Sequence, residues 1–194
     1  MEILSDQLGH SQGNSNKNLH IQEPLFYHNQ EDQGYFSVWY KDIDGIKENN
    51  RQYTYPLKDM EYALNNLDTK QNCFITQAEF SALNRRKANF KRIGLNFLDI
   101  DACKAEKEPT LEDILDTCEK EDEMPSLVIA SGGGFYPKWL NDKPIETEDL
   151  DKWSAIQHGL CEKFKHLGAD PKALDISRVL RVEKDIYSRM SQPP

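Results

Sequence analysis

Residues 93–101 read IGLNFLDID, an apolar run that ends in two carboxylates, Asp99 and Asp101. Such a run is typical of a buried strand, which we predict over 93–100. Alternate residues of a strand point to the same face, so the two carboxylates would lie together at its end. Like charges held this close repel each other, and their oxygens suit a hard cation such as Mg²⁺ or Mn²⁺. For this short pattern alone, a pair of solvated acids is the alternative.

A second strand, predicted over 126–130 (SLVIA), runs directly into Ser131, Gly132, Gly133 and Gly134. Consecutive glycines cost conformational entropy. They allow backbone N–H groups to approach a phosphate closely, and the Ser131 hydroxyl can add a hydrogen bond. A tight hairpin turn is an equal alternative. The spacing matches neither a P-loop nor a dinucleotide-binding fingerprint.

A third element, LDISRVLRV at 174–182, places Asp175 beside Arg178 and Arg181. The carboxylate could complete a site of three acids, while the arginines could neutralise phosphate or hold the acids in place. A surface ion pair is the alternative, and it would contribute little. The basic stretch 85–92 (RRKANFKR) could meet a triphosphate or a template backbone, or form a solvated helix end.

Strands and helices alternate irregularly along the rest of the chain, which favours the α+β class. We predict strands at 35–40, 73–75 and 135–140, and helices at 58–67, 77–83, 110–119 and 148–167. Thr110 and Thr147 are expected to cap the last two helices, Gly168 to end the last one and Pro144 to lie in a loop. The apolar face of the last helix is expected to comprise Leu150, Trp153, Ile156, Leu160, Phe164 and Leu167.

The 194 residues carry a net charge of −9, which argues against a protein that binds nucleic acid over much of its surface. It allows an enzyme that binds nucleic acid locally, through metal ions and a few Arg or Lys side chains. Residues 1–22 are polar and aperiodic and are expected to form a flexible tail, followed by one domain over 23–194. No apolar run is long enough for a membrane span, and no secretory signal is present, so we expect a cytoplasmic protein. The four cysteines have no metal-binding spacing and are expected to be reduced and mostly buried.

Taken in order, FLDID at 97–101, ASGGGFYPKWL at 130–140 and LDISRVLRV at 174–182 resemble the three motifs of archaeo-eukaryotic primases and primase-polymerases. The resemblance covers about residues 70–190 and is closest to domains of plasmid and mobile-element replication proteins. It implies an RRM-like catalytic sheet of mixed or antiparallel strands flanked by helices. It also implies two divalent ions, Mg²⁺ or Mn²⁺, held by Asp99, Asp101 and Asp175, and template-dependent primer synthesis in DNA replication.

The same resemblance implies the nucleotide-binding residues and the partners. The Ser131–Gly134 turn would lie near the incoming triphosphate, with Lys138 as a further candidate there. Tyr136 stands about where many members carry a nucleotide-contacting His. The implied partners are nucleoside triphosphates, a single-stranded DNA template, and a helicase or accessory replication domain.

Two alternatives remain. The chain reads EKDIY at 183–187, where many plasmid members continue with Gly-Thr and an Asn, and it carries Tyr136 in place of the His. A catalytically degenerate primase fold that binds nucleic acid or a partner protein is therefore an alternative. A phosphatase that uses D-x-D is a weaker one, because Ala102 and Cys103 follow where Gly-Thr is expected.

Overall fold

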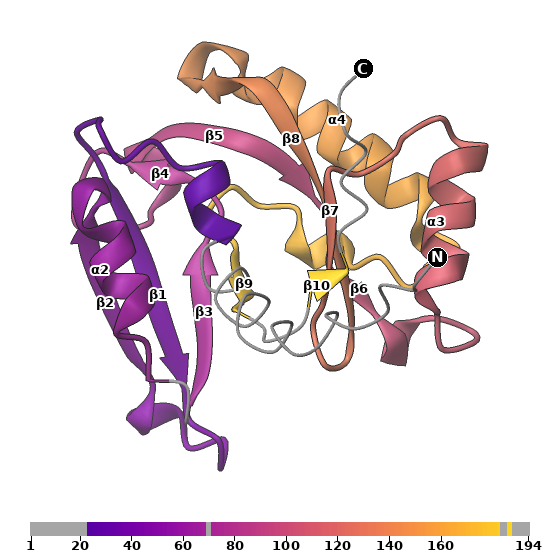
Figure 1. Cartoon of the computed structure of the whole chain (residues 1–194), viewed down its shortest axis with the longest axis horizontal. Helices are drawn as coiled ribbons and strands as arrows, with labels where there is room; N and C mark the ends of the chain where they lie inside the picture. Colours follow the sequence, from indigo (N-terminus) through magenta and orange to yellow (C-terminus); the bar gives the residue numbers. More distant parts are fainter. Residues whose placement is uncertain (1–22, 69–70, 183–185, 188–194) are drawn as a thin grey trace, which may run out of the picture.

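The computed structural model describes residues 23–68, 71–182 and 186–187. The predicted tail at 1–22 lies outside them. The described strands form one sheet with the order β10-β7-β8-β5-β4-β1-β3-β9, with β2 beside β1 and β6 beside β8, and every pairing is antiparallel (Figure 1). The strands are β1 (Tyr35–Lys41), β2 (Arg51–Pro56), β3 (Asn72–Thr76), β4 (Glu79–Phe80), β5 (Phe90–Phe97), β6 (Ile100–Asp101), β7 (Leu127–Ala130), β8 (Gly134–Glu146), β9 (Val179–Arg181) and β10 (Ile186–Tyr187).

Three α-helices flank the described part of the sheet: α2 (Met60–Asn65), α3 (Leu111–Lys120) and α4 (Leu150–Lys163). Short 3₁₀ helices connect the elements: η1 (Glu23–Phe26), η2 (Lys47–Asn49), η3 (Leu57–Asp59), η4 (Lys87–Asn89), η5 (Ala102–Lys104), η6 (Thr147–Asp149), η7 (Lys165–Leu167) and η8 (Pro171–Ala173). No helix in these ranges combines the length and the apolar character that crossing a bilayer requires.

The sheet has two halves, which Figure 1 shows side by side. One half contains β1–β3 with α2, and its core is built around Phe36, Val38 and Met60. The other contains β5–β8 with α3 and α4, and its outer core includes Ile100, Ile114 and Phe164. The two-residue strand β4 pairs with β1 on one side and with β5 on the other, so it joins the halves into one sheet.

The predicted α+β class and the antiparallel character of the sheet are confirmed. Strands were predicted at the positions of β1, β3 and β7, and Thr110 caps α3 in a reciprocal capping box with Asp113. Gly168 ends the segment after α4 with a positive φ of 90°. All four cysteines are free thiols, and Cys103 alone is exposed.

Four local expectations were wrong. The helix predicted over 77–83 is replaced by β4, because Glu79 is buried in a polar network rather than solvated. Pro144 lies within β8 at a register irregularity, where the missing N–H removes no ladder bond. Thr147 begins η6 and makes no side-chain cap, and Ile156 is 53% exposed while its neighbour Gln157 is fully buried.

Helix α4 is fastened to β5 through Gln157 and Trp153. The Gln157 side chain accepts hydrogen bonds from Asn96 Nδ2 (2.9 Å) and the Phe97 backbone N–H (3.2 Å), and donates to the Phe97 carbonyl. Trp153 Nε1 donates to the Leu95 carbonyl at 2.9 Å. Side chains of a helix thus satisfy the edge of β5 that faces away from β8.

Replacing Gln157 with leucine tests how much these hydrogen bonds between α4 and β5 contribute to stability. The volume is nearly conserved, but the Phe97 N–H and carbonyl and the Asn96 amide lose their buried partner. We expect Q157L to lower the free energy of unfolding by about 2–4 kcal/mol. Urea denaturation monitored by tryptophan fluorescence measures the change, and the exposed Gln33 supplies the control variant Q33L, expected within about 0.5 kcal/mol of the parent. Equal stability of Q157L and the parent would contradict the assignment.

Candidate functional site

Asp99 and Asp101 do not lie on one continuous strand. Strand β5 ends at Phe97, the Leu98 N–H still donates to the Pro137 carbonyl of β8 at 3.0 Å, and ladder pairing with β8 resumes at Ile100 in β6. At this break the Asp99 carbonyl accepts from the Asp170 N–H at 2.8 Å, and the Asp101 N–H donates to the Gly168 carbonyl at 3.1 Å. The segment that follows α4 is therefore bound to the two acids along its backbone.

Three carboxylates and two cations alternate at this break. Arg178 Nη2 lies 2.8 Å from Asp99 Oδ2 and 3.9 Å from Asp170 Oδ2. Lys104 Nζ lies 2.7 Å from Asp170 Oδ2 and 3.5 Å from Asp101 Oδ2. We call these five residues the acid cluster. The two cations leave it with one net negative charge, so the repulsion expected between the acids is only partly offset.

Asp170 is the buried centre of the acid cluster, with 7% of its surface exposed. Burial acts to raise the pKa of its carboxyl, but hydrogen bonds from Lys104 and the Lys172 N–H and the charge of Arg178 hold it below the ordinary value. Burial likewise acts to lower the pKa of Lys104, and Asp170 and Asp101 raise it overall. Both groups are therefore charged at neutral pH.

The Ser131–Gly134 turn joins β7 to β8 and contacts the strand that carries Asp101. The Ser131 N–H donates to the Gly134 carbonyl at 2.9 Å, and Gly132 has a positive φ of 76°. A Cβ on Gly134 would lie 1.8 Å from the Ile100 carbonyl oxygen, whereas one on Gly133 would meet nothing within 4 Å. The geometry of a tight hairpin turn thus explains why positions 132 and 134 are glycines. Gly133 has no such requirement and faces open space.

Tyr136 lies where the second and third motifs meet Asp99 of the first motif. Burial and, to a smaller extent, the Asp99 charge raise the pKa of its hydroxyl to about 12, although hydrogen bonds from Ser131 and the Arg181 N–H partly oppose them. Arg181 Nη1 also donates to the Ser131 carbonyl at 3.4 Å. Tyr136 is therefore a neutral hydroxyl group at physiological pH, held between Asp99, Ser131 and Arg181.

Asp175 lies in the loop before β9 and is turned toward its own chain. Its carboxylate accepts from the Ser177 N–H at 2.8 Å and from the Ser177 hydroxyl. It also borders a cavity of about 340 Å³ whose walls include Lys87, His158 and Lys172. In the described ranges, no three His, Cys, Asp or Glu side chains stand in an arrangement that would hold a metal ion.

The basic stretch 85–92 divides between two places. Arg85 donates to the Ser177 carbonyl at 2.7 Å, and Asp175 and Arg178 both influence its pKa, which burial lowers. Lys91 and Arg92 instead form ion pairs with Asp32 far along the sheet. Only the first part of the stretch therefore adjoins the third motif.

Lys138 lies apart from the acid cluster. The residue is 1% exposed, and its ammonium group bonds to Glu23, to Gln77 Oε1 (2.7 Å) and to Tyr27 Oη (3.2 Å). Burial lowers its pKa and Glu23 opposes that shift. Because this cation is internally paired, we leave Lys138 out of the proposed nucleotide site.

The sequence interpretation missed Asp170 and Lys104. Asp170 precedes Pro171, a pattern that predicts only a helix cap, and it does accept from the Lys172 N–H at 3.0 Å. Its second role depends on the backbone bond to Asp99, which no local pattern reveals. Lys104 follows Asp101 by three residues and carried no signal of its own.

Comparisons with known proteins agree with this architecture. No family model matches the chain. The AEP domain of a cyanophage S-2L primase-polymerase superposes with a TM-score of 0.57 at 17% identity, covering 91% of this chain and 85% of that domain. The catalytic domain of primase RepB′, solved with initiator DNA, superposes with a TM-score of 0.51 at 13% identity, covering 90% and 85%.

A "Replication protein" of Clostridium perfringens is 35% identical over 138 residues, which are 69% of this chain and 32% of that protein. This chain therefore spans about a third of the length of the curated relative it matches. The predicted resemblance is confirmed: the chain has the fold of the archaeo-eukaryotic primase-polymerase domain. None of these three proteins carries a phosphatase name, so that alternative gains no support.

The two glycines of the turn yield a matched pair of variants. In G134A the new methyl group would overlap the Ile100 carbonyl, so we expect β6 to be displaced and the protein to lose about 2–4 kcal/mol of unfolding free energy. G133A meets open space at an ordinary φ, so its stability is expected within about 0.5 kcal/mol of the parent. Thermal and urea unfolding measure both, and a destabilised G133A would show that the turn is placed incorrectly.

Proposed function

We propose that this chain is the nucleotidyltransferase domain of a replication protein, and that it synthesises primers on single-stranded DNA from nucleoside triphosphates. The observation that carries the proposal is the convergence of all three motifs: Arg178 binds Asp99, and Tyr136 lies between Asp99, Ser131 and Arg181. Residues from three separate segments meet at one surface of a primase-polymerase fold. We further propose a plasmid or mobile element as the replicon, with a helicase or accessory domain as partner.

The donor set fits a hard divalent cation in its chemistry, since Asp99 and Asp101 offer carboxylate oxygens in a cluster with a net negative charge. We propose that these two acids, with Asp175 as the third ligand, hold Mg²⁺ or Mn²⁺. Such an ion would polarise the α-phosphate and stabilise the departing pyrophosphate. In the structure the carboxylate of Asp99 forms an ion pair with Arg178, and that of Asp101 forms one with Lys104.

The chain's own groups would act on the phosphates. In the proposed reaction a 3′-hydroxyl attacks the α-phosphate, a P–O bond forms, and the bond to pyrophosphate breaks as the hydroxyl proton leaves to solvent. Arg178 is oriented by Asp99, and its buried Nε has no partner within the described protein, so it has a donor free for a phosphate oxygen. Tyr136 would donate a hydrogen bond without adding charge, and the open face at Gly133 would admit the triphosphate.

One observation favours a catalytically degenerate binding module instead. Asp99 and Asp170 are already paired with Arg178 and Lys104, and the described residues contain no three-ligand group. A module of this kind would keep its acids neutralised permanently. Nucleotide turnover separates the two functions.

The decisive assay incubates the purified chain with single-stranded DNA, Mg²⁺ or Mn²⁺, and labelled NTPs or dNTPs. We expect oligonucleotide synthesis by the parent and by D116A, which removes an exposed acid on α3, and none by D99A/D101A. Circular dichroism checks that all variants are folded. If the parent makes no product and also fails to extend a primed template, the degenerate module becomes the better account.

Asp170 gives a second test, because it orients Lys104 and Arg178 without being one of the proposed metal ligands. D170N keeps the shape and removes the charge that both cations share. The loss of charged hydrogen bonds worth about 1.5–3 kcal/mol corresponds to a decrease in kcat/KM of roughly 10- to 150-fold. D116N is the matched control. Unchanged kinetics in folded D170N would remove Asp170 from the site.

A further inference from the structure

A second cavity, of about 250 Å³, lies at the far end of β5 and β8 from the acid cluster. Its walls include Phe26, His28, Glu79, Arg92, Asn141 and Asp142, and we call it the distal pocket. Arg92 lies near the start of β5 and Asp99 just beyond its end, a separation of about 20 Å at the usual strand rise. None of the three sequence motifs contributes to the distal pocket.

Unpartnered nitrogens gather in the distal pocket. Across the residues that the structure describes, four buried side-chain nitrogens have no hydrogen-bond partner in the protein. Three of them belong to residues lining this pocket: His28 Nδ1, Arg92 Nη2 and Asn141 Nδ2. His28 is 4% and Arg92 8% exposed. His28 Nδ1 has Glu79 at ion-pair distance, which leaves Arg92 Nη2 and Asn141 Nδ2 as the two nitrogens of the pocket without a partner among the described residues. Because buried polar atoms are nearly always paired, two unpaired donors around one cavity point to a ligand that would accept from them.

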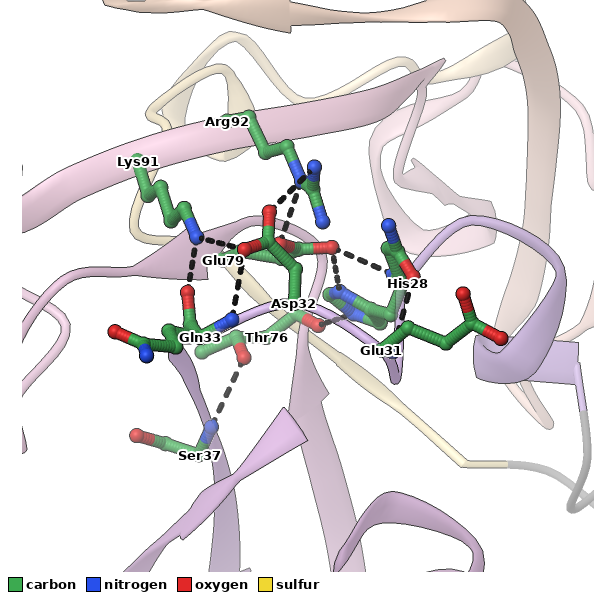
Figure 2. A network of polar contacts seen from close by, with 10 residues as sticks. His28, Glu31, Asp32, Gln33, Ser37, Thr76, Glu79, Lys91 and Arg92 are labelled. Carbon is green, nitrogen blue, oxygen red and sulfur yellow. Dashed lines mark hydrogen bonds and ion pairs between the residues drawn. The ribbon is translucent and has the colours of Figure 1, made fainter. Parts of the chain in front are cut away.

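Ion pairs and hydrogen bonds fix the orientation of these groups. Figure 2 shows Arg92 held by two carboxylates: Nε donates to Glu79 Oε2 at 2.7 Å, and Nη1 lies 2.8 Å from Asp32 Oδ2. His28 Nε2 lies 3.1 Å from the Thr76 carbonyl, to which it must be the donor. His28 Nδ1 lies 3.7 Å from Glu79 Oε1, beyond hydrogen-bond distance but within ion-pair distance of that carboxylate.

The charges around the distal pocket disfavour an anion. Burial acts to raise the pKa of Glu79, but His28, the Asn29 N–H and Arg92 outweigh it and hold the pKa below the ordinary value. A hydrogen bond from Lys91 lowers the pKa of Asp32. Both acids are thus ionised beside Arg92, and the exposed Asp142 lines the same pocket. Lys91 offsets the charge of Asp32, and Glu79, Asp142 and Arg92, which line the pocket, leave no net positive charge to hold a phosphate group.

An uncharged ligand with acceptors on one edge fits better. The two N–H donors, on Arg92 and Asn141, match the acceptor atoms on the edge of a nucleobase. Phe26 also lines the cavity and is 58% exposed, so its ring offers a stacking face. Aromatic stacking together with edge hydrogen bonds is how proteins recognise single-stranded bases.

We propose that the distal pocket binds one unstacked base of single-stranded DNA, with Phe26 stacking on it and Arg92 and Asn141 donating hydrogen bonds to its edge. That this strand is the template rests on the proposed function. The base-binding chemistry of the pocket does not, because it follows from the unpaired nitrogens and the charge balance alone.

Fluorescence anisotropy, without nucleoside triphosphates, tests the proposal. The probes are a labelled single-stranded oligodeoxynucleotide of mixed sequence and an abasic oligomer of equal length, which keeps the phosphates and lacks the bases. The variants are N141D, which replaces the donor with an acceptor, and F26A, which removes the stacking ring. N65D makes the same change as N141D on the exposed face of α2, away from the pocket.

We expect N141D and F26A to weaken binding of the base-bearing strand at least about fivefold. On the abasic oligomer we expect N141D to bind as N65D does and F26A to bind as the parent does. Parent-like binding of both probes by both variants would overturn the proposal. So would equal weakening of both probes relative to N65D, which would indicate a phosphate contact. Base discrimination by a parent that synthesises no primer would instead reject the proposed function and keep the distal pocket.

Discussion

Beyond Arg92, strand β5 has a partner strand on one side only in the described structure, and helix α4 supplies the missing hydrogen bonds from side chains. Gln157 satisfies both backbone groups of Phe97, two residues before Asp99. The segment after the same helix then returns to Asp99 through the Asp170 N–H. Helix α4 and the segment that follows it thus hold the chain at two points, Phe97 and Asp99, and a leucine in place of Gln157 would release the first of these restraints.

The ion pairs of the acid cluster are better suited to orienting its side chains than to stabilising the fold. Replacing partly buried ion pairs with apolar groups often leaves stability unchanged or improves it, so such pairs are weak evidence of a stabilising role. What Lys104 and Arg178 do is keep three carboxylates close together despite their repulsion. Each cation touches two of the acids, so a change at any one acid alters the position of the others. Asp170 has the greatest influence because both cations contact it.

Local signals in the sequence predicted the elements whose stability is local. The apolar run at 127–130 became β7, and Thr110 with Asp113 formed the capping box of α3. The motif residues Asp99, Ser131, Tyr136, Arg178 and Arg181 do converge, whereas their metal and nucleotide contacts remain predictions. Lys138 lies two residues after Tyr136 in β8, so both side chains point to the same face of the sheet. Lys138 nevertheless bonds to Glu23, because alternation along a strand predicts the face of a side chain but not its contacts.

Other features depended on contacts between distant segments. The helical periodicity predicted that Ile156 would be buried, but the polar Gln157 is buried instead. The reason is that β5, among the described strands, has no partner along that edge, and Gln157 supplies the missing hydrogen bonds. Strand β4 is two residues long, too short for any periodic signal, and it exists because β1 and β5 pair with it from both sides. Asp170 acquired its role in the acid cluster through a backbone bond to Asp99 that no residue pattern encodes.

Strand β9 has a consequence for the order of assembly. It pairs with β3 in one half of the sheet, while Arg178, just before it, bonds Asp99 across 79 residues of sequence in the other half. Contacts of such long range close large loops and form slowly. During synthesis from the N-terminus, β5, β7 and β8 can fold before β9 leaves the ribosome. The ion pair between Arg178 and Asp99 therefore forms late, and until then Asp99 lacks this cation, whereas Asp101 can already pair with Lys104.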